Sequence, residues 1–209
     1  MGINYSPKIV TDGLVLCLDA ANPLSYPGSG TRWYDISGQN AHCDSVGSPT
    51  FTGNGASSYW QFTTSQRFNS IDIDQEYRDL FIICKLEDAG IRMIFSQYDG
   101  LDKSLRFVGG NTRSSTDGND WEHNELSKTF VNGNFNSGGV SIYNQWAFIR
   151  AYRSNNNFGT NFRYQISSSW NSSARGYIGK INYIGCYSRE LNNEEVLQNY
   201  NALKGRFGL

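Results

Sequence analysis

The sequence contains no apolar run near the roughly 18 residues that a membrane-spanning helix requires. Its opening residues, MGINYSPKIVTDG, lack the apolar segment of a secretory signal peptide. Charged residues are scarce too, since they make up 18% of the chain and leave a net charge of −1. These absences predict no insertion into a membrane, no secretion, and no basic surface able to hold nucleic acid.

Cysteine is too sparse for the common metal and redox motifs. The four cysteines, Cys17, Cys43, Cys84 and Cys186, stand singly, and no Cys-x-x-Cys pair occurs. This spacing excludes a zinc knuckle and a dithiol redox motif. Three of the four lie in apolar stretches, where a free thiol acts as a small hydrophobic group. We expect reduced thiols in the core, with a Cys17–Cys186 disulfide as the alternative if their strands pair.

What the chain does contain is glycine, aromatic residues and small polar residues. It has 22 glycines, and 14% of its residues are aromatic. Aromatic side chains suit pleated strands, while glycine, asparagine and serine suit the turns between them. The length fits a single domain, residues 1–209, and no repeat of 20–50 residues is visible. About ten to twelve short strands and one terminal helix predict an antiparallel sandwich or barrel.

The stretch Asp12–Gly38 organises the rest of the chain, because it begins with a strand that is apolar on both faces. The two faces carry Leu14, Leu16 and Leu18 on one parity, and Val15 and Cys17 on the other. A strand buried this way needs a partner that also lies inside. We expect that partner to be Tyr177–Tyr187, at the opposite end of the chain.

Three further strands are strongly apolar. Asp79–Lys85 and Gln145–Tyr152 have the composition of strands covered on both faces. The last strand, Gly176–Tyr187, carries Ile184 and Cys186 on one face, with Ile181 out of phase. This phase change predicts a β-bulge.

One helix is predicted, at Asn193–Leu203. Asn192 and Glu195 have the spacing of a capping box, in which each side chain bonds the other residue's backbone N–H. Leu191 and Val196 occupy the positions of a hydrophobic staple. The apolar stripe of this helix is expected to consist of Val196, Leu197, Tyr200 and Leu203.

Both chain ends resemble a known family. The opening DGLVLCLDAANPLSYPGSGTRWYDISGQNAH, the Asn144-Gln145-Trp146 segment and the ending GKINYIGCYSRELNNEEVLQNYNALKGRFG are similar to laminin-G-like, concanavalin A-like lectin/glucanase domains. The resemblance is to the version in virion structural proteins of tailed, cyanophage-type bacteriophages. It implies an all-β, two-sheet antiparallel jelly-roll sandwich with a short C-terminal helix, and with the first and last strands adjacent.

The same resemblance implies a function without catalysis. It points to a structural protein of a virion, as tail fibre, baseplate or capsid decoration, located on the particle. Its partners would be other virion proteins and further copies of itself. The alternative is a carbohydrate-binding module that recognises a host-surface glycan.

Two tryptophans are the candidate glycan contacts. Trp121 and Trp170 stand in polar loops, and His123 lies beside the first. Sugars stack their C–H faces on aromatic rings, while neighbouring polar groups bond the hydroxyls. The competing interpretation is that each tryptophan packs on a sheet edge or in a subunit interface.

The sequence contains no complete motif for a catalytic or metal site. Asp72 and Asp74 share a strand face, but Ser70 stands where a retaining glycosidase would carry its nucleophile. Three loop aspartates of the kind that ligate calcium are Asp99, Asp102 and Asp117, and their spacing fits no calcium-loop motif. We therefore expect no enzymatic activity, no cofactor and no bound metal.

Overall fold

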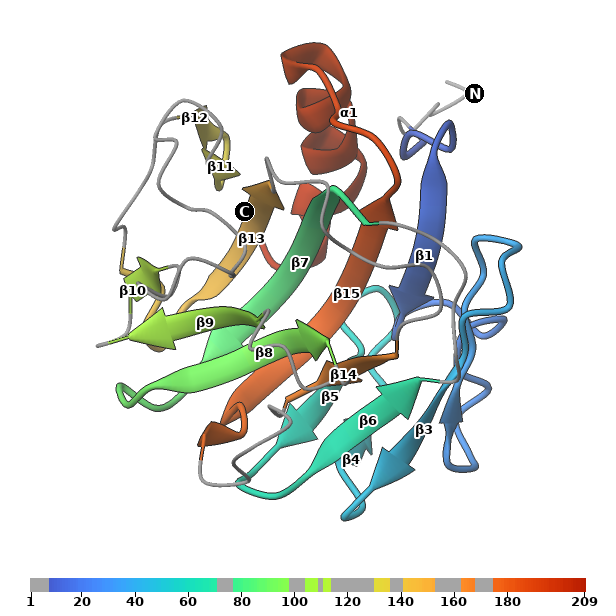
Figure 1. Ribbon diagram of the computed structural model, residues 1–209, viewed down its shortest axis with the longest axis vertical. Helices are drawn as coiled ribbons and strands as arrows, with labels where there is room; N and C mark the ends of the chain where they lie inside the picture. The colour runs from blue at the N-terminus through green and yellow to red at the C-terminus, as the bar shows by residue number, and fades with distance from the viewer. Residues whose placement is uncertain are drawn as a thin grey trace.

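The structure, a computed structural model, describes residues 8–70, 77–97, 104–108, 111–113, 130–135, 141–152, 163–167 and 175–209. Two antiparallel sheets lie face to face, and a short helix packs against the outer face of one of them (Figure 1). The predicted all-β sandwich with a C-terminal helix is therefore confirmed.

The first sheet has eight strands in the described part of the chain. In spatial order it consists of β12 (Asn134–Phe135), β11 (Phe130–Val131), β13 (Trp146–Tyr152), β7 (Asp79–Leu86), β15 (Gly179–Tyr187), β5 (Tyr59–Phe62) and β4 (Thr50–Thr52), while β1 (Leu14–Asp19) also pairs with β15. β15 therefore has β7 on one side, and β1 and β5 share its other side.

The second sheet has seven described strands. Their order is β10 (Asn111–Arg113), β9 (Ser104–Val108), β8 (Arg92–Gln97), β14 (Tyr164–Ile166), β6 (Arg67–Ser70), β3 (Cys43–Val46) and β2 (Arg32–Trp33). The helix α1 (Asn193–Leu203) follows β15 and runs into a 3-10 turn, η2 (Lys204–Arg206).

The two ends of the chain pair as the sequence predicts. β1 and β15 are antiparallel neighbours, with Leu18 opposite Ile184 and Asp19 opposite Tyr183. In Figure 1 the blue β1 lies beside the red β15. A segment near residue 15 and one near residue 185 thus share backbone hydrogen bonds at the centre of the first sheet.

Two bulges in the described part of the first sheet set which of its side chains face inward. The register of β15 against β7 shifts between Ile181 and Tyr183, so Asn182 is the extra residue and the predicted bulge is confirmed. A second shift, between Leu14 and Leu16, was not predicted. It turns Leu14 toward the outer side of the sheet and leaves Val15 with the inner core, so the expected single face of three leucines is wrong.

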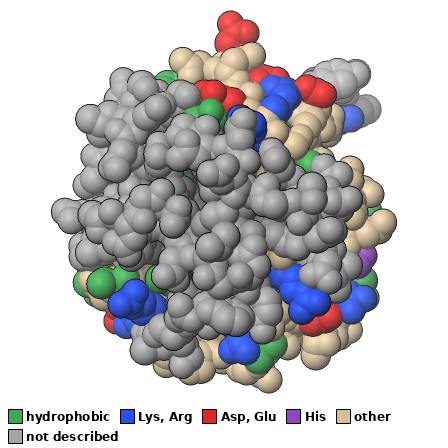
Figure 2. Space-filling view, viewed as in Figure 1, with side chains coloured by type: hydrophobic (Ala, Val, Ile, Leu, Met, Phe, Trp, Pro, Cys, Tyr) green, Lys and Arg blue, Asp and Glu red, His purple; other side chains and the backbone are tan. Residues whose placement is uncertain are grey.

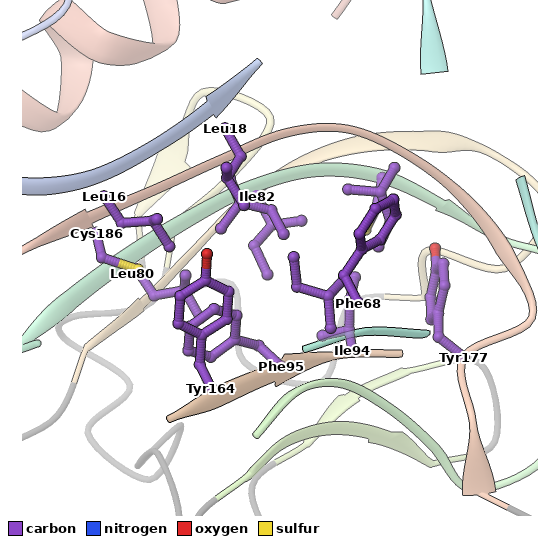
Figure 3. Packing of buried hydrophobic residues seen from close by; sticks show 14 of the residues in the cluster. Leu16, Leu18, Phe68, Leu80, Ile82, Ile94, Phe95, Tyr164, Tyr177 and Cys186 are labelled. Atoms are coloured by element: carbon purple, nitrogen blue, oxygen red, sulfur yellow. The ribbon is translucent and has the colours of Figure 1, made fainter. Parts of the chain in front are cut away.

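The space between the sheets holds the main core (Figure 3). Its first-sheet side includes Leu16, Leu18, Leu80, Ile82 and Cys186, and its second-sheet side includes Phe68, Ile94, Phe95 and Tyr164. Figure 3 shows these two sets of side chains pointing toward one another from opposite strands. Trp33 and Trp60, 0% and 2% exposed, also lie in this core.

All four cysteines are free and buried. Cys186 faces the inner core, whereas Cys17 faces the outer side of the sheet, opposite Gly185. The alternative of a Cys17–Cys186 disulfide is therefore wrong, because side chains on opposite faces of a sheet cannot bond. Burial raises the pKa of the Cys17 and Cys84 thiols to about 12.

The outer face of the first sheet carries a second apolar cluster beneath α1. Phe81, Ile83, Phe148, Tyr183 and Tyr187 of the sheet pack there against Leu191, Val196 and Leu203. The helix begins with the predicted capping box between Asn192 and Glu195. Because the first sheet is covered on both faces here, its strands are apolar at both parities.

One position of the predicted helix stripe is wrong. Leu197 is 37% exposed, and Asn199 is buried instead. The Asn199 amide accepts a hydrogen bond from the Val10 N–H at 2.8 Å and donates one to the Tyr187 hydroxyl at 3.1 Å. A polar side chain is stable on this buried face because both ends of its amide are bonded.

A buried ion pair joins the sheet to the start of the helix. Arg150 and Asp79, with side chains 2% and 0% exposed, form two parallel hydrogen bonds of 2.7 Å. The Leu191 N–H donates to Asp79 at 2.8 Å, and the Leu191 carbonyl accepts from Arg150 at 3.0 Å. Burial raises the pKa of the Asp79 carboxyl, and the bonds from Arg150 act in the opposite direction. The residue just before the capping box is thereby fixed to two strands.

We expect Asp79→Ala to destabilise the fold by about 3–5 kcal/mol, because it leaves the Arg150 charge buried without its partner. The matched control is Arg32→Ala, which removes an equally bidentate pair, Arg32–Asp44, whose side chains are 43% and 46% exposed. Exposed pairs contribute little, so this variant should unfold close to the wild-type midpoint. Urea unfolding measures the free energy of unfolding of both variants. Equal losses of stability in the two variants would contradict the role given to the buried pair.

Candidate functional site

The glycan contacts expected from the sequence, Trp121, His123 and Trp170, lie outside the described residues. The same holds for the aspartates considered for catalysis or calcium, namely Asp72, Asp74, Asp99, Asp102 and Asp117. Within the described ranges, no group of three or more histidine, cysteine, aspartate or glutamate side chains is placed to hold a metal ion. None of the helices in those ranges is long and apolar enough to cross a bilayer.

The Trp-Tyr-Asp-x-Ser-Gly part of the resemblance forms a structural anchor. The Asp35 carboxylate, 6% exposed, accepts hydrogen bonds from the N–H groups of Cys17, Ser37 and Ala41 at 2.8–3.1 Å. It also accepts from the Ser37 hydroxyl at 2.8 Å. Its acceptor positions are occupied by its own chain, so this residue fixes the β2–β3 loop to β1.

The chain ends are held together by a second anchor. Arg206 donates to Asp19 through two hydrogen bonds of 2.7 and 2.8 Å, and to the Asn182 amide oxygen at 2.9 Å. The Asn182 side chain in turn donates to the Ser58 carbonyl at 2.6 Å. The residue that forms the bulge in β15 therefore joins the first strand, the last strand and the tail.

The candidate site lies on the outer face of the first sheet, at the edge of the apolar cluster, and its residues are partly buried. Four residues stand directly opposite one another on neighbouring strands: Trp146 of β13, Lys85 of β7, Lys180 of β15 and Gln61 of β5. Strands lie about 4.8 Å apart, so this row spans roughly 14 Å. Tyr59 and Glu87 complete it, and we call these six residues the lysine–aromatic patch.

Glu87 holds the polar part of the patch together. Its carboxylate lies 3.2 Å from the Lys180 ammonium and 3.8 Å from that of Lys85. Its second oxygen accepts a hydrogen bond of 3.1 Å from the Gln61 amide. These three charged side chains are 23–24% exposed, so each is partly accessible to solvent.

Two aromatic rings that contact each other lie beside the charged groups. The Lys180 ammonium lies 5.0 Å from the centre of the Tyr59 ring, a cation–π contact. Trp146 meets Tyr59 edge to face at 5.8 Å and stacks on Phe207 of the tail at 3.6 Å. Phe207 of the tail thus covers one face of the Trp146 ring and fixes the orientation of that ring.

The patch combines the groups that recognise a hydroxylated ring. Two aromatic side chains offer apolar faces and edges, lysine supplies N–H donors, glutamate supplies acceptors, and glutamine supplies both. Trp146 also covers part of the sheet, since it packs against the outer apolar cluster. The patch itself was missed because it exists only through the pairing of four strands that are far apart in the chain.

A second exposed surface lies on the β2–β3 side of the second sheet. Basic, acidic and histidine side chains appear together there in Figure 2. Tyr34, 39% exposed, packs edge to face on His42 at 5.2 Å, and the Arg32–Asp44 pair lies alongside. On this surface Tyr34 is an exposed ring, and the charges of Arg32 and Asp44 neutralise each other. Variants of these residues therefore serve as controls for variants of the lysine–aromatic patch.

Comparisons with known proteins place the chain by its fold. No family model matches the sequence, and no curated protein matches it. The structure is similar to domain 4 of AbnA, a GH43 extracellular arabinanase from Geobacillus stearothermophilus, in complex with arabinotriose. That similarity has a TM-score of 0.58 at 14% identity and covers 90% of this chain and 98% of that one.

Two further structures are similar over part of their length. An HCR/D mutant matches with a TM-score of 0.58 at 12% identity, covering 94% of this chain and 52% of that chain. Trypanosoma rangeli sialidase in complex with 2,3-difluorosialic acid matches with a TM-score of 0.50 at 13% identity, covering 92% and 33%. This chain thus spans about half of the former and a third of the latter. At these identities the likeness establishes a β-sandwich fold.

We expect Glu87→Gln to lower stability by less than about 1 kcal/mol, because Lys85 and Lys180 then face each other without a counter-charge. The glutamine keeps an oxygen that accepts from Gln61, so the change in stability reports the loss of the negative charge alone. Adding Lys85→Met should restore the wild-type urea midpoint, and high salt should shrink the difference. A loss that neither Lys85→Met nor salt relieves would contradict this electrostatic account.

Proposed function

We propose that this chain is a non-enzymatic carbohydrate-binding domain, and that the lysine–aromatic patch is its binding surface. The observation that carries this proposal is the row of Trp146, Lys85, Lys180 and Gln61 across four strands. It lies on a rigid sheet, at the part of the outer face where the apolar cluster under α1 ends.

A saccharide fits this surface in a simple way. One sugar ring lies against Trp146 or Tyr59, whose rings are already oriented by their own packing. Its hydroxyls then bond Gln61, Glu87 and the lysines. Because the Trp146 and Tyr59 rings are already packed, little of their side-chain entropy is lost when the sugar binds.

Binding without catalysis is supported by the carboxylate content of the patch. Glycoside hydrolysis generally uses two carboxyl groups on either side of the scissile bond, about 5–5.5 Å apart in retaining enzymes. Of the six patch residues, Glu87 alone carries a carboxyl group, and it is engaged with two lysines. The fold is compatible with the proposal, since the similar domain of the arabinanase was solved with arabinotriose.

The direct test is a glycan array probed with the wild-type chain and with Trp146→Ala. We expect saccharide binding that falls at least about tenfold in the variant, because a stacked ring and its hydrogen bonds are lost. Gln61→Ala, which leaves the Trp146–Phe207 stack intact, should also weaken binding and guards against a folding defect. Tyr34→Ala, on the second sheet, is the control expected to bind like the wild type. Binding that survives the first two changes would contradict the proposed surface.

We propose a structural role in a virion as the second candidate function. It is supported by the resemblance of both chain ends to tailed-phage virion proteins, in which this chain would be a tail-fibre, baseplate or decoration component. The partners would be other virion proteins and further copies of the chain, and the location would be the particle. The two candidates are compatible, since a virion protein can carry a glycan-binding domain.

For the virion role, we expect the purified chain to form a closed oligomer, because subunits of particles assemble with rotational symmetry. Light scattering over a range of concentrations measures its mass. A constant mass of two or more copies supports this role, and a monomer at every concentration opposes it. Trp146→Ala should leave this mass unchanged, so that assembly and glycan binding are read separately.

A further inference from the structure

We infer that the lysine–aromatic patch selects acidic saccharides, those with a carboxylate or sulfate group on the ring. This inference rests on the proposed function and names its ligand class. It depends on how Lys85 and Lys180 are placed relative to Glu87 and to the two rings.

The two lysines form a like-charge pair across neighbouring strands. Lys85 of β7 and Lys180 of β15 are directly opposite in the register. Both side chains lie on the outer face, since Ile83 packs in the outer cluster and Ile181 in the inner core. Like charges directly opposite across two strands repel. Such a local conflict is expected where residues serve binding rather than stability.

Glu87 offsets only part of this repulsion. Its carboxylate is 3.2 Å from Lys180, within hydrogen-bonding range, but 3.8 Å from Lys85, which is too long for a hydrogen bond. The charges of these three side chains sum to one positive charge. An ammonium group has three donors, so Lys85 keeps donors for a further anion. The site is thus short of one negative group.

The neighbouring rings decide what kind of anion fits. Trp146 stands opposite Lys85 on β13, and Tyr59 lies against Lys180. The two rings meet edge to face at 5.8 Å, so an anion bound to the lysines would lie beside this aromatic pair. A sugar acid meets both requirements at once, because its ring stacks while its acid group contacts the ammonium groups. A nucleic acid would instead need a broad basic field, and the chain as a whole has a net charge of −1.

Affinity electrophoresis of the whole chain tests the inference with three probes: polygalacturonate, heparin and a neutral galactan. Heparin distinguishes sulfate from the carboxylate of polygalacturonate, and the galactan has no acid group. We expect retardation by at least one acidic polymer and none by the galactan, weakening as salt is raised. Lys85→Met and Lys180→Met should each weaken acidic binding at least about tenfold, since hydrogen bonds to charged groups are the strong ones.

The control is Lys204→Met, whose ammonium lies over the Tyr200 ring rather than in the patch and whose binding should equal the wild type. Binding of neutral glycans that needs Trp146 but neither lysine would overturn the acidic selectivity and leave the proposed function standing. Binding of acidic polymers that Trp146→Ala does not weaken would instead remove the proposed surface. Equal losses in Lys204→Met and the patch variants would reduce the effect to overall charge and overturn the inference.

Discussion

The structure depends on one constraint: the first sheet is buried on both faces over part of its length. Its inner face meets the second sheet, and its outer face meets α1 and the tail. Along β7 the outer face changes from Phe81 and Ile83, under the helix, to Lys85 beyond it. An eleven-residue helix is about 16 Å long. The extent of its cover therefore sets where apolar surface ends and where polar groups become available to a ligand.

The residues that carry the resemblance at the chain ends turn out to be fold-determining ones. Asp35 fixes a loop to β1, and Asp19 and Arg206 join the first strand to the tail. Arg189 forms a bidentate pair with Glu195 of the capping box, at 2.6 and 2.9 Å. A similarity based on such residues is evidence for a shared fold. It is not by itself evidence for a shared ligand, because most residues of the lysine–aromatic patch lie on strands between the two chain ends.

Much of the framework was predictable because its signals are local or strongly periodic. The helix bounds, the capping box and the bulge at Asn182 follow from residue types and phase within short segments. The predictions for Leu14 and Leu197 are wrong for physical reasons. An unpredicted bulge turns Leu14 to the outer face of the sheet. On the helix, Asn199 is buried where Leu197 was expected, because its amide is hydrogen-bonded. The patch was invisible from sequence because the strands of Lys85 and Lys180 are nearly a hundred residues apart, and only their register brings them opposite.

The position of β15 has a kinetic consequence. It is the last strand of the chain, yet β1, β5 and β7 all pair with it at the centre of the first sheet. During synthesis those three strands leave the ribosome first and must wait, with apolar edges open, until residue 187 follows them. When β15 pairs with β1, β5 and β7, it joins segments that are far apart in sequence, and such pairing is slow in β proteins. The completion of the sandwich therefore waits for the synthesis of β15, and the nascent chain is most exposed to aggregation just before it.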